Sequence, residues 1–120
     1  MNGNFVISRS KDGEFYFKLY SSDGRALAQG ECFDTLLACK SGLASACECL
    51  DAEIAPREQI SFGIGKAMYE IVEEEDGFEF FLKGAFGEVL AFSDRFADYE
   101  ECYRAAKELS QLEIDIEDLD

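Results

Sequence analysis

The sequence predicts an α+β protein in which one antiparallel-rich sheet carries two helices on one of its faces. Short segments of alternating apolar and polar residues are separated by turns that end in glycine, which is typical of β-hairpins. After each group of strands the apolar residues recur every three or four positions, which indicates a helix. The whole pattern occurs twice, so we expect two tandem β-β-β-α-β units.

The first unit begins with three predicted strands. The first strand, around Phe5, ends at the turn 11–13, and Asp-Gly in that turn favours a type I′ hairpin with positive φ angles. The second strand covers 15–20, and its side chains point alternately to the two faces of the sheet. A turn at 22–24 leads into a third strand over 25–32.

A helix is predicted from Asp34 onward, and Asp34 or Thr35 can cap its start by accepting from free backbone N–H groups. Gly42 lies in its middle, where glycine costs about 1 kcal/mol relative to alanine. We expect this glycine to allow close packing of the helix on the sheet. The predicted apolar face of the helix consists of Leu36, Cys39, Leu43, Cys47 and Leu50.

The same order of elements recurs in the second half of the chain. Its predicted elements are a strand at 69–72, a hairpin turn at 76–77, strands at 78–83 and 88–92, and a helix that opens near Asp98. Residues of the same type recur 63 positions later along the chain: Leu19 and Leu82, Gly24 and Gly87, Leu27 and Leu90, Phe33 and Phe96, Cys39 and Cys102.

The expected organisation is therefore one domain over 1–120, made of a first unit at 4–56 and a second unit at 66–120. The stretch 57–65 is the predicted joint between them. A short segment of alternating polarity follows each helix, at 52–55 and at 112–116, and we expect both segments to form edge strands.

The first hairpin resembles a known family. Ser-Lys-Asp-Gly-Glu-Phe-Tyr-Phe-Lys-Leu at 10–19, followed by Ser-Asp-Gly at 22–24, resembles the YegP-like family of small bacterial proteins of uncharacterised function, and so does the helical run 38–43. The second half is similar to it more loosely, with Glu-Glu-Asp-Gly at 74–77. The resemblance implies units that form one sheet and exchange their C-terminal strands. It supplies no catalytic or ligand-binding residues.

Charge and cysteine content restrict the partners and the compartment. Eleven basic residues against 26 acidic ones give a net charge of −15, whereas nucleic acids and anionic membranes attract basic surfaces. We therefore expect no nucleic acid and no membrane as a partner, but a protein with a basic surface. The five cysteines, an odd number, and the lack of a signal peptide predict a cytoplasmic protein with free thiols. We expect a monomer or a weak homodimer.

Catalytic and metal-binding signatures are absent from the sequence. It has no histidine, which excludes Ser-His-Asp and Cys-His nucleophilic schemes and most zinc sites. A phosphate-binding loop ending at 67 would need glycine and a hydroxyl residue where Ile60 and Ala67 stand. We therefore predict no catalytic residue, no metal site, no cofactor, and a protein that is not an enzyme.

The sheet face opposite the helices, which we call the helix-free face, is the candidate binding surface. Exposed aromatic residues among polar ones can mark such a surface, although cross-strand pairs that only support the sheet would give the same pattern. Alternation along the second strand of each unit places on this face Tyr16, Lys18, Tyr20, Phe81 and Lys83.

The leading hypothesis is a non-enzymatic interaction or accessory protein of the cytoplasm. The alternative is a small-molecule binding module whose ligand lies on the helix-free face near Tyr16 and Phe81. A thiol-dependent enzyme that uses Cys49 is a third hypothesis, and Cys49 is the cysteine that we expect to be exposed. The cysteines expected to pack in the core are Cys39, Cys47 and Cys102.

Overall fold

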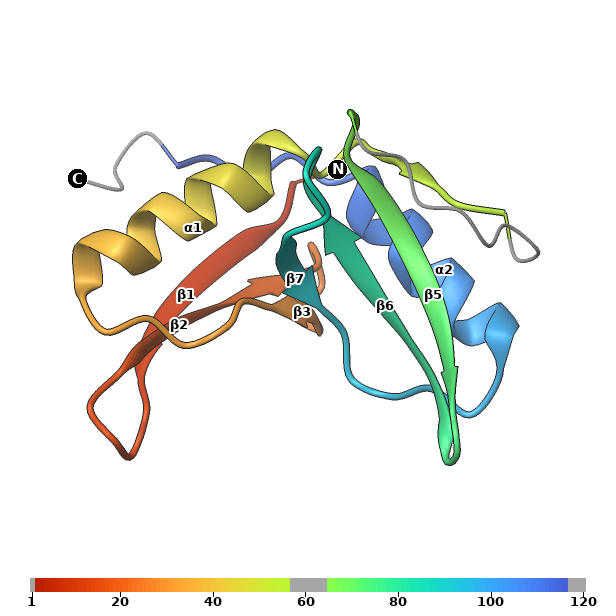
Figure 1. The fold of residues 1–120 in the computed structure, drawn as a ribbon, viewed down its shortest axis with the longest axis horizontal. Helices are drawn as coiled ribbons and strands as arrows, with labels where there is room; N and C mark the ends of the chain where they lie inside the picture. The colour runs from red at the N-terminus through yellow and green to blue at the C-terminus, as the bar shows by residue number, and fades with distance from the viewer. Residues whose placement is uncertain (1, 57–64, 117–120) are drawn as a thin grey trace.

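A computed structural model describes residues 2–56 and 65–116, and within them one sheet of seven strands is combined with two helices (Figure 1). The strand order is β1-β2-β3-β7-β6-β5-β4. The sheet is mixed, because β4 and β5 are parallel. The elements are β1 (Asn4–Arg9), β2 (Phe15–Tyr20), β3 (Ala26–Gln29), α1 (Leu36–Glu48), β4 (Glu53–Ile54), β5 (Met68–Glu74), β6 (Gly77–Lys83), β7 (Val89–Phe92) and α2 (Tyr99–Ser110).

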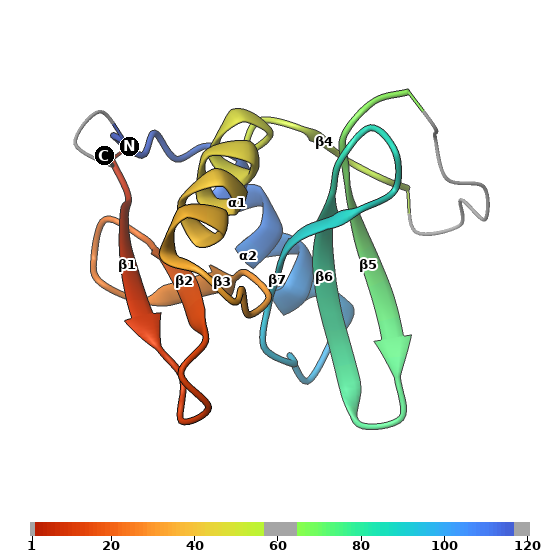
Figure 2. The same ribbon diagram turned by 60° about the vertical axis from the view of Figure 1, so that its left-hand side comes forward.

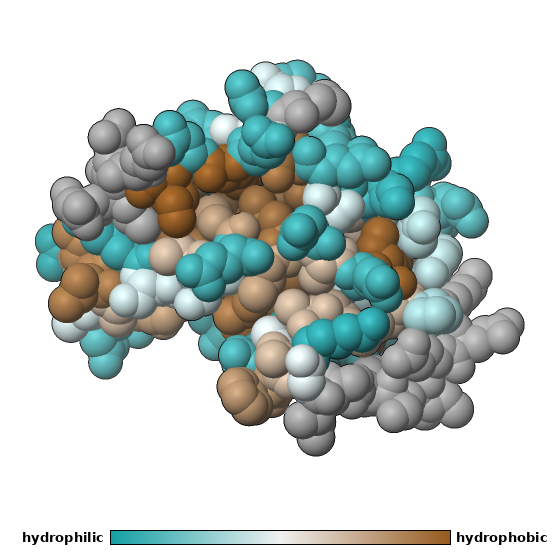
Figure 3. Space-filling view, turned by 90° about the horizontal axis from the view of Figure 1, so that it is seen from above, coloured by the Kyte–Doolittle hydropathy of each residue, from teal (hydrophilic) through white to brown (hydrophobic). Residues whose placement is uncertain are grey.

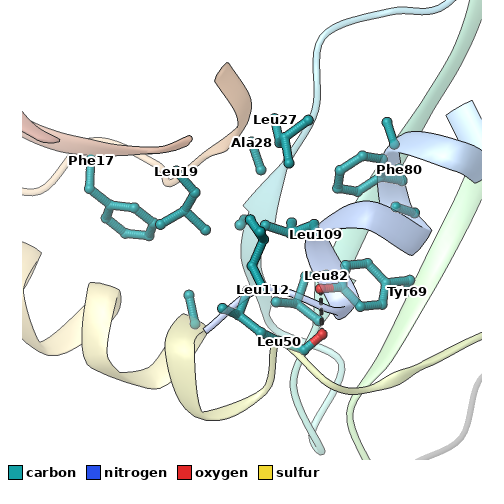
Figure 4. Packing of buried hydrophobic residues seen from close by; sticks show 14 of the residues in the cluster. Phe17, Leu19, Leu27, Ala28, Leu50, Tyr69, Phe80, Leu82, Leu109 and Leu112 are labelled. Carbon is teal, nitrogen blue, oxygen red and sulfur yellow. Dashed lines mark hydrogen bonds between the residues drawn. The ribbon is translucent and has the colours of Figure 1, made fainter. Parts of the chain in front are cut away.

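The predicted α+β class, with one sheet and two helices, is confirmed, and both helices lie against the face that carries the buried strand residues. Side chains from both halves of the chain meet in one hydrophobic cluster (Figure 4). Its fully buried members include Phe17, Leu19, Cys39, Leu43, Tyr69, Phe80, Leu82, Cys102 and Leu109.

Hydrogen bonding joins the two halves of the sheet weakly. β1 pairs with β2, and β5 with β6, along the whole length of the strands. β3 and β7, which lie at the centre of the sheet, are paired only at Gln29 and Phe92. The two outer hairpins diverge on either side of this junction (Figures 1 and 2). The shared core therefore holds together two half-sheets that the strand ladder barely connects.

The segments that follow the helices pair with strands from the other half of the chain. β4 follows α1 and runs parallel to β5, at the edge of the sheet. After α2, Glu113 forms a parallel bridge with Asn2, and its carbonyl oxygen accepts from the N–H of Gly3 at 2.9 Å. The predicted strand 112–116 is thus reduced to a single bridge. Of the predicted joint 57–65, all but Gly65 lies outside the described residues.

Local details of strand pairing recur between the halves. Phe15 and Phe33 form an isolated antiparallel bridge, and Phe78 and Phe96 form the corresponding one 63 positions later. The register of the sheet shifts after Leu19 in the first half and at the matching Leu82 in the second.

The hairpin turns differ from the predicted type. In the first turn the N–H of Gly13 donates to the carbonyl of Ser10 at 3.0 Å, and the N–H of Ser10 donates to the carbonyl of Glu14 at 2.7 Å. Among the described residues only glycines have positive φ, at 83° for Gly13. A type I′ turn needs positive φ at both central residues, so the prediction was wrong in turn type, although the turn position was right. Gly24 and Gly87 repeat the first arrangement.

The surroundings of Gly42 and the end of the third strand are two further differences from the sequence prediction. A Cβ on Gly42 would lie 2.5 Å from the Phe33 ring, so this glycine accommodates Phe33 rather than the sheet itself. The third strand ends at Gln29 instead of residue 32. A Cβ on Gly30 would lie 2.3 Å from the buried Phe17 ring, which occupies the space beside the backbone there.

The two helix starts follow the sequence. The Thr35 hydroxyl accepts from the N–H of Ala38 at 3.1 Å, so Thr35 rather than Asp34 is the N-cap of α1. The Asp98 carboxylate accepts from the N–H of Glu101 at 2.8 Å at the start of α2. Leu36 departs from the predicted apolar face, because its side chain is 41% exposed.

Tyr69 links the two halves at the end of α1. Its fully buried side chain comes from β5, and its hydroxyl donates to the carbonyl of Leu50 at 2.7 Å (Figure 4). The ring also packs edge-on against Phe80, with 5.8 Å between the centroids. Burial, and to a smaller extent the nearby Asp51 carboxylate, raises the pKa of the Tyr69 phenol.

Tyr69→Phe is expected to lower the free energy of unfolding by about 1–3 kcal/mol, because the buried Leu50 carbonyl would lose its donor. Urea unfolding at pH 7 measures this, and Tyr103→Phe, at a surface tyrosine, is the control with a change within about 0.5 kcal/mol. Because the phenol pKa is raised, the effect of this substitution on the free energy of unfolding should depend on pH. The neutral form of Tyr69 contributes stability below about pH 10, and that contribution is lost as the pH rises. The deficit of Tyr69→Phe should therefore shrink in alkali, and a deficit that grows with pH would contradict this account.

Candidate functional site

The residues predicted for the helix-free face fall into two groups on that face. Tyr16, Lys18 and Tyr20 come from β2, where they alternate with the fully buried Phe17 and Leu19. Phe81 and Lys83 come from β6, where they alternate with Phe80 and Leu82 in the same way. Because β3 and β7 run between β2 and β6, the face consists of two separate patches joined across the centre of the sheet.

The β2 patch is aromatic and partly exposed. Lys18 lies between Val6 of β1 and Gln29 of β3, and the Val6 side chain is 45% exposed. Tyr16 pairs with Ser8 of β1. Two tyrosines, an exposed valine and one lysine thus form a mixed surface on this side of the junction.

The β6 patch is internally paired. Phe81 lies opposite Glu70 of β5 and Phe92 of β7, and the Phe81 and Phe92 rings are 6.5 Å apart between centroids. The Lys83 ammonium lies 2.8 Å from the Glu70 carboxylate. Such cross-strand contacts are what we expect if these residues only support the sheet. Because Lys83 is paired with Glu70, it contributes little free positive charge to the surface.

Phe92 is a member of this face that sequence reasoning missed. It borders the hollow at the β3–β7 junction, together with Lys18 and Asp94. The hollow has a volume of about 20 Å³, which is room for about one water molecule. The sequence feature that could have pointed to Phe92 is the 63-residue offset, which aligns it with Gln29 in the third strand of the first half. The register shift after Leu82, which brings Phe92 beside Phe81, has no sequence signal that we can identify.

Positions that match between the two halves carry different chemistry on this face. The position of Lys18 matches that of Phe81, and the position of Tyr20 matches that of Lys83. Tyr16 matches Glu79, whose pKa is raised by burial and by the nearby Glu74 carboxylate. One patch is therefore rich in tyrosine, whereas the other is bordered by carboxylates.

The cysteines are placed differently from the prediction at two positions. Cys49 was expected to be exposed but is half-buried against the core, and Cys32 is the exposed cysteine. Burial raises the pKa of Cys49, and Glu48 adds to the effect, so Cys49 is no activated thiolate. Cys39 and Cys102 are fully buried as predicted, whereas Cys47 is only partly buried.

Residues 2–56 and 65–116 contain neither a cluster of metal-binding side chains nor a helix that could span a membrane. No three side chains of the kinds that bind metals come close enough together there to hold an ion. Neither helix in this part of the chain has the length and apolar character needed to cross a membrane.

Cys32 is expected to react first with a thiol reagent such as 5,5′-dithiobis(2-nitrobenzoate) in the native protein at pH 8. The other thiols react slowly because burial raises their pKa values, to about 11 for Cys47 and about 12 for Cys102. Stopped-flow absorbance gives the rates. Cys32→Ser should remove the fast phase and Cys49→Ser should leave it, and the opposite result would show Cys49 to be the accessible thiol.

Comparison with known proteins finds a match to one family model and to two solved structures. Residues 10–54 match the family described as Domain of unknown function (DUF1508). A search of curated proteins finds no significant match. The solution NMR structure of yegP from E. coli, a protein of unknown function, is similar with a TM-score of 0.71 and 21% identity, over 95% of this chain and 91% of that chain.

A second solution NMR structure, of a UPF0339 protein from Shewanella oneidensis, has a TM-score of 0.65 and 19% identity, over 95% of this chain and 90% of that chain. At these identities the two matches show a common fold. Residues 10–54 are therefore similar to the DUF1508 family, and the chain has the fold of yegP over 95% of its length, in agreement with the resemblance found in the sequence.

Proposed function

We propose that this protein is a non-enzymatic interaction protein that binds a partner protein through its helix-free face. The observation that carries the proposal is the set of partly exposed apolar and aromatic residues on a face with no helix above it. A sheet covered on one face normally exposes polar side chains on the other. Here the open face presents Val6, Tyr16, Tyr20, Phe81 and Phe92.

The shape of this face favours a protein partner over a small molecule. Small-molecule sites are concave and typically enclose about 300–1,000 Å³. The hollow between Lys18 and Phe92 measures only about 20 Å³. Protein interfaces are flatter and are enriched in aromatic residues, which is the composition found here.

The charge of the chain favours a partner with a basic surface. The net charge of −15 would steer such a partner toward the protein and make its association depend on salt. On the face itself Lys83 is paired with Glu70, whereas Asp94 is exposed at the central junction and Glu79 lies near Glu74. A lysine or arginine of the partner would find carboxylates beside the aromatic residues.

We further propose that the chain is a tandem pair of units, 4–56 and 66–120, that exchange their C-terminal strands. The 63-residue offset between the Phe15–Phe33 and Phe78–Phe96 bridges supports this organisation. So does the pairing of β4 with β5 and of Glu113 with Asn2. Exchange within one chain gives each unit the strand that it lacks, which favours a monomer. The free cysteines favour a cytoplasmic location, and the similarity to yegP from E. coli favours a bacterial protein.

Tyr16→Ala/Phe81→Ala is expected to weaken capture of the partner at least tenfold, because buried aromatic anchors carry much of the energy of an interface. Affinity capture from cell lysate with quantitative mass spectrometry, at low and high salt, measures this. The matched control is Leu37→Ala/Phe86→Ala, which removes two exposed apolar side chains elsewhere. The partner should be retained by the control and lost at high salt.

A photo-crosslinking amino acid at position 16, compared with position 86, then shows whether the captured protein contacts the face. Capture that does not depend on salt, or that survives the Tyr16→Ala/Phe81→Ala change, would refute the proposal. A metabolite that stabilises the wild type in a thermal-shift screen but not this variant would favour the small-molecule alternative.

A further inference from the structure

The C-terminal ends of both helices meet on one side of the molecule. The end of α1 and the end of α2 both approach the segment that follows α2 (Figure 1). A hollow of about 440 Å³ lies there, with Leu50, Leu112 and Ile114 among its lining residues. A second hollow, of about 470 Å³, adjoins it and shares Asp51, Ser110 and Gln111 with it. We call the two joined hollows the acidic groove.

The groove combines apolar and polar surface. Leu50 and Leu112 are buried, whereas Cys47, Ile54 and Ile114 are partly exposed and present apolar surface to a ligand. Seen from above, hydrophobic and hydrophilic residues lie side by side on this face of the molecule (Figure 3). An extended segment with both apolar and polar side chains would match this combination.

The rim of the groove is negatively charged. Glu48, Asp51 and Glu113 line the first hollow and are exposed. None of these three carboxylates has an ion pair within 4 Å among residues 2–56 and 65–116. The described lining includes one cation, Lys107, in the second hollow. The pKa of Cys49, raised first by burial and then by Glu48, with Asp51 also contributing, is consistent with this negative charge.

The end of α1 adds to the negative potential, whereas α2 carries Lys107 in its last turn. The last carbonyl groups of a helix carry a partial negative charge, which a basic residue in the last turn normally offsets. α1 has no basic residue in its last turn and ends at Glu48 instead. Glu48 is therefore mildly unfavourable at the end of α1, and a bound cation would offset this cost.

We propose that the acidic groove is the docking site for a basic peptide segment of a partner protein, with lysine or arginine at the rim and an aliphatic side chain on the floor. Charge complementarity selects this occupant. A bare metal ion does not fit, because the described residues bring no three potential metal ligands together. The inference rests on the basic partner of the proposed function, but it does not depend on the helix-free face.

A synthetic ten-residue peptide of lysine, arginine and leucine, labelled with fluorescein, is the probe. Fluorescence anisotropy at low salt measures its Kd for the full chain. Glu48→Gln/Asp51→Asn/Glu113→Gln is expected to weaken binding at least tenfold. The matched control, Asp12→Asn/Glu73→Gln/Glu75→Gln, makes the same change in net charge at exposed hairpin positions and should change Kd less than threefold. If both variants lost the same affinity for the peptide, net charge alone would explain the binding, and the inference would be overturned.

The apolar contact has its own test. A peptide with serine in place of leucine keeps its charge and should bind the wild type several times more weakly. Amide chemical-shift changes on titration with the leucine peptide should concentrate at 47–54 and 110–114. Changes concentrated on β2 and β6 instead would overturn the inference. The groove variant should unfold at no lower urea concentration than the wild type, which separates lost binding from lost structure.

The two proposals can fail separately. If Tyr16→Ala/Phe81→Ala abolishes peptide binding and the groove variant retains it, the acidic groove is refuted while the helix-free face stands. If the groove variant alone loses the peptide, and the partner's capture is indifferent to Tyr16 and Phe81, the groove stands and the proposed interface is refuted.

Discussion

The shared hydrophobic core is the constraint on which the rest of this structure depends. Among the described residues, β3 and β7 pair at the centre of the sheet only through Gln29 and Phe92, which contributes little to holding the two half-sheets together. Burial of Phe17 and Phe80 in one cluster, covered by both helices, supplies the missing attraction. The bond from Tyr69 to the carbonyl of Leu50 fixes the end of α1 against the second half.

Because both helices lie on one face of the sheet, the side chains of the helix-free face are left without a covering layer. The aromatic residues there pack across strands, as Phe81 does with Phe92, and remain partly exposed. Matching positions of the two halves differ on this face, since Lys18 corresponds to Phe81, whereas the core leucines Leu19 and Leu82 are the same. The core residues serve the fold in both halves, whereas the residues of the open face are not needed to fill the core.

The ends of the two helices come together because of the way the chain continues after each helix. Each helix packs against its strands and then leads into a segment that pairs with the other half of the chain. This crossing brings Leu50 and Leu112 to the same side of the molecule. Glu48 and Asp51 stand where a positive charge would have stabilised α1, so this region departs from what helix stability alone would choose.

Sequence alone determined the features that depend on neighbours along the chain. The alternation in 15–20 and 78–83, the cap at Asp98 and the positions of the glycine turns follow from local sterics and hydrogen bonding, and the 63-residue offset located the recurring core positions. Only tertiary structure decided the rest. The role of Gly42 depends on the Phe33 ring, the place of Phe92 on a register shift, and the exposure of Cys32 rather than Cys49 on what packs beside each thiol. Such contacts join residues that are distant in sequence, and their energies depend on the shape of the packed core, which no local pattern encodes.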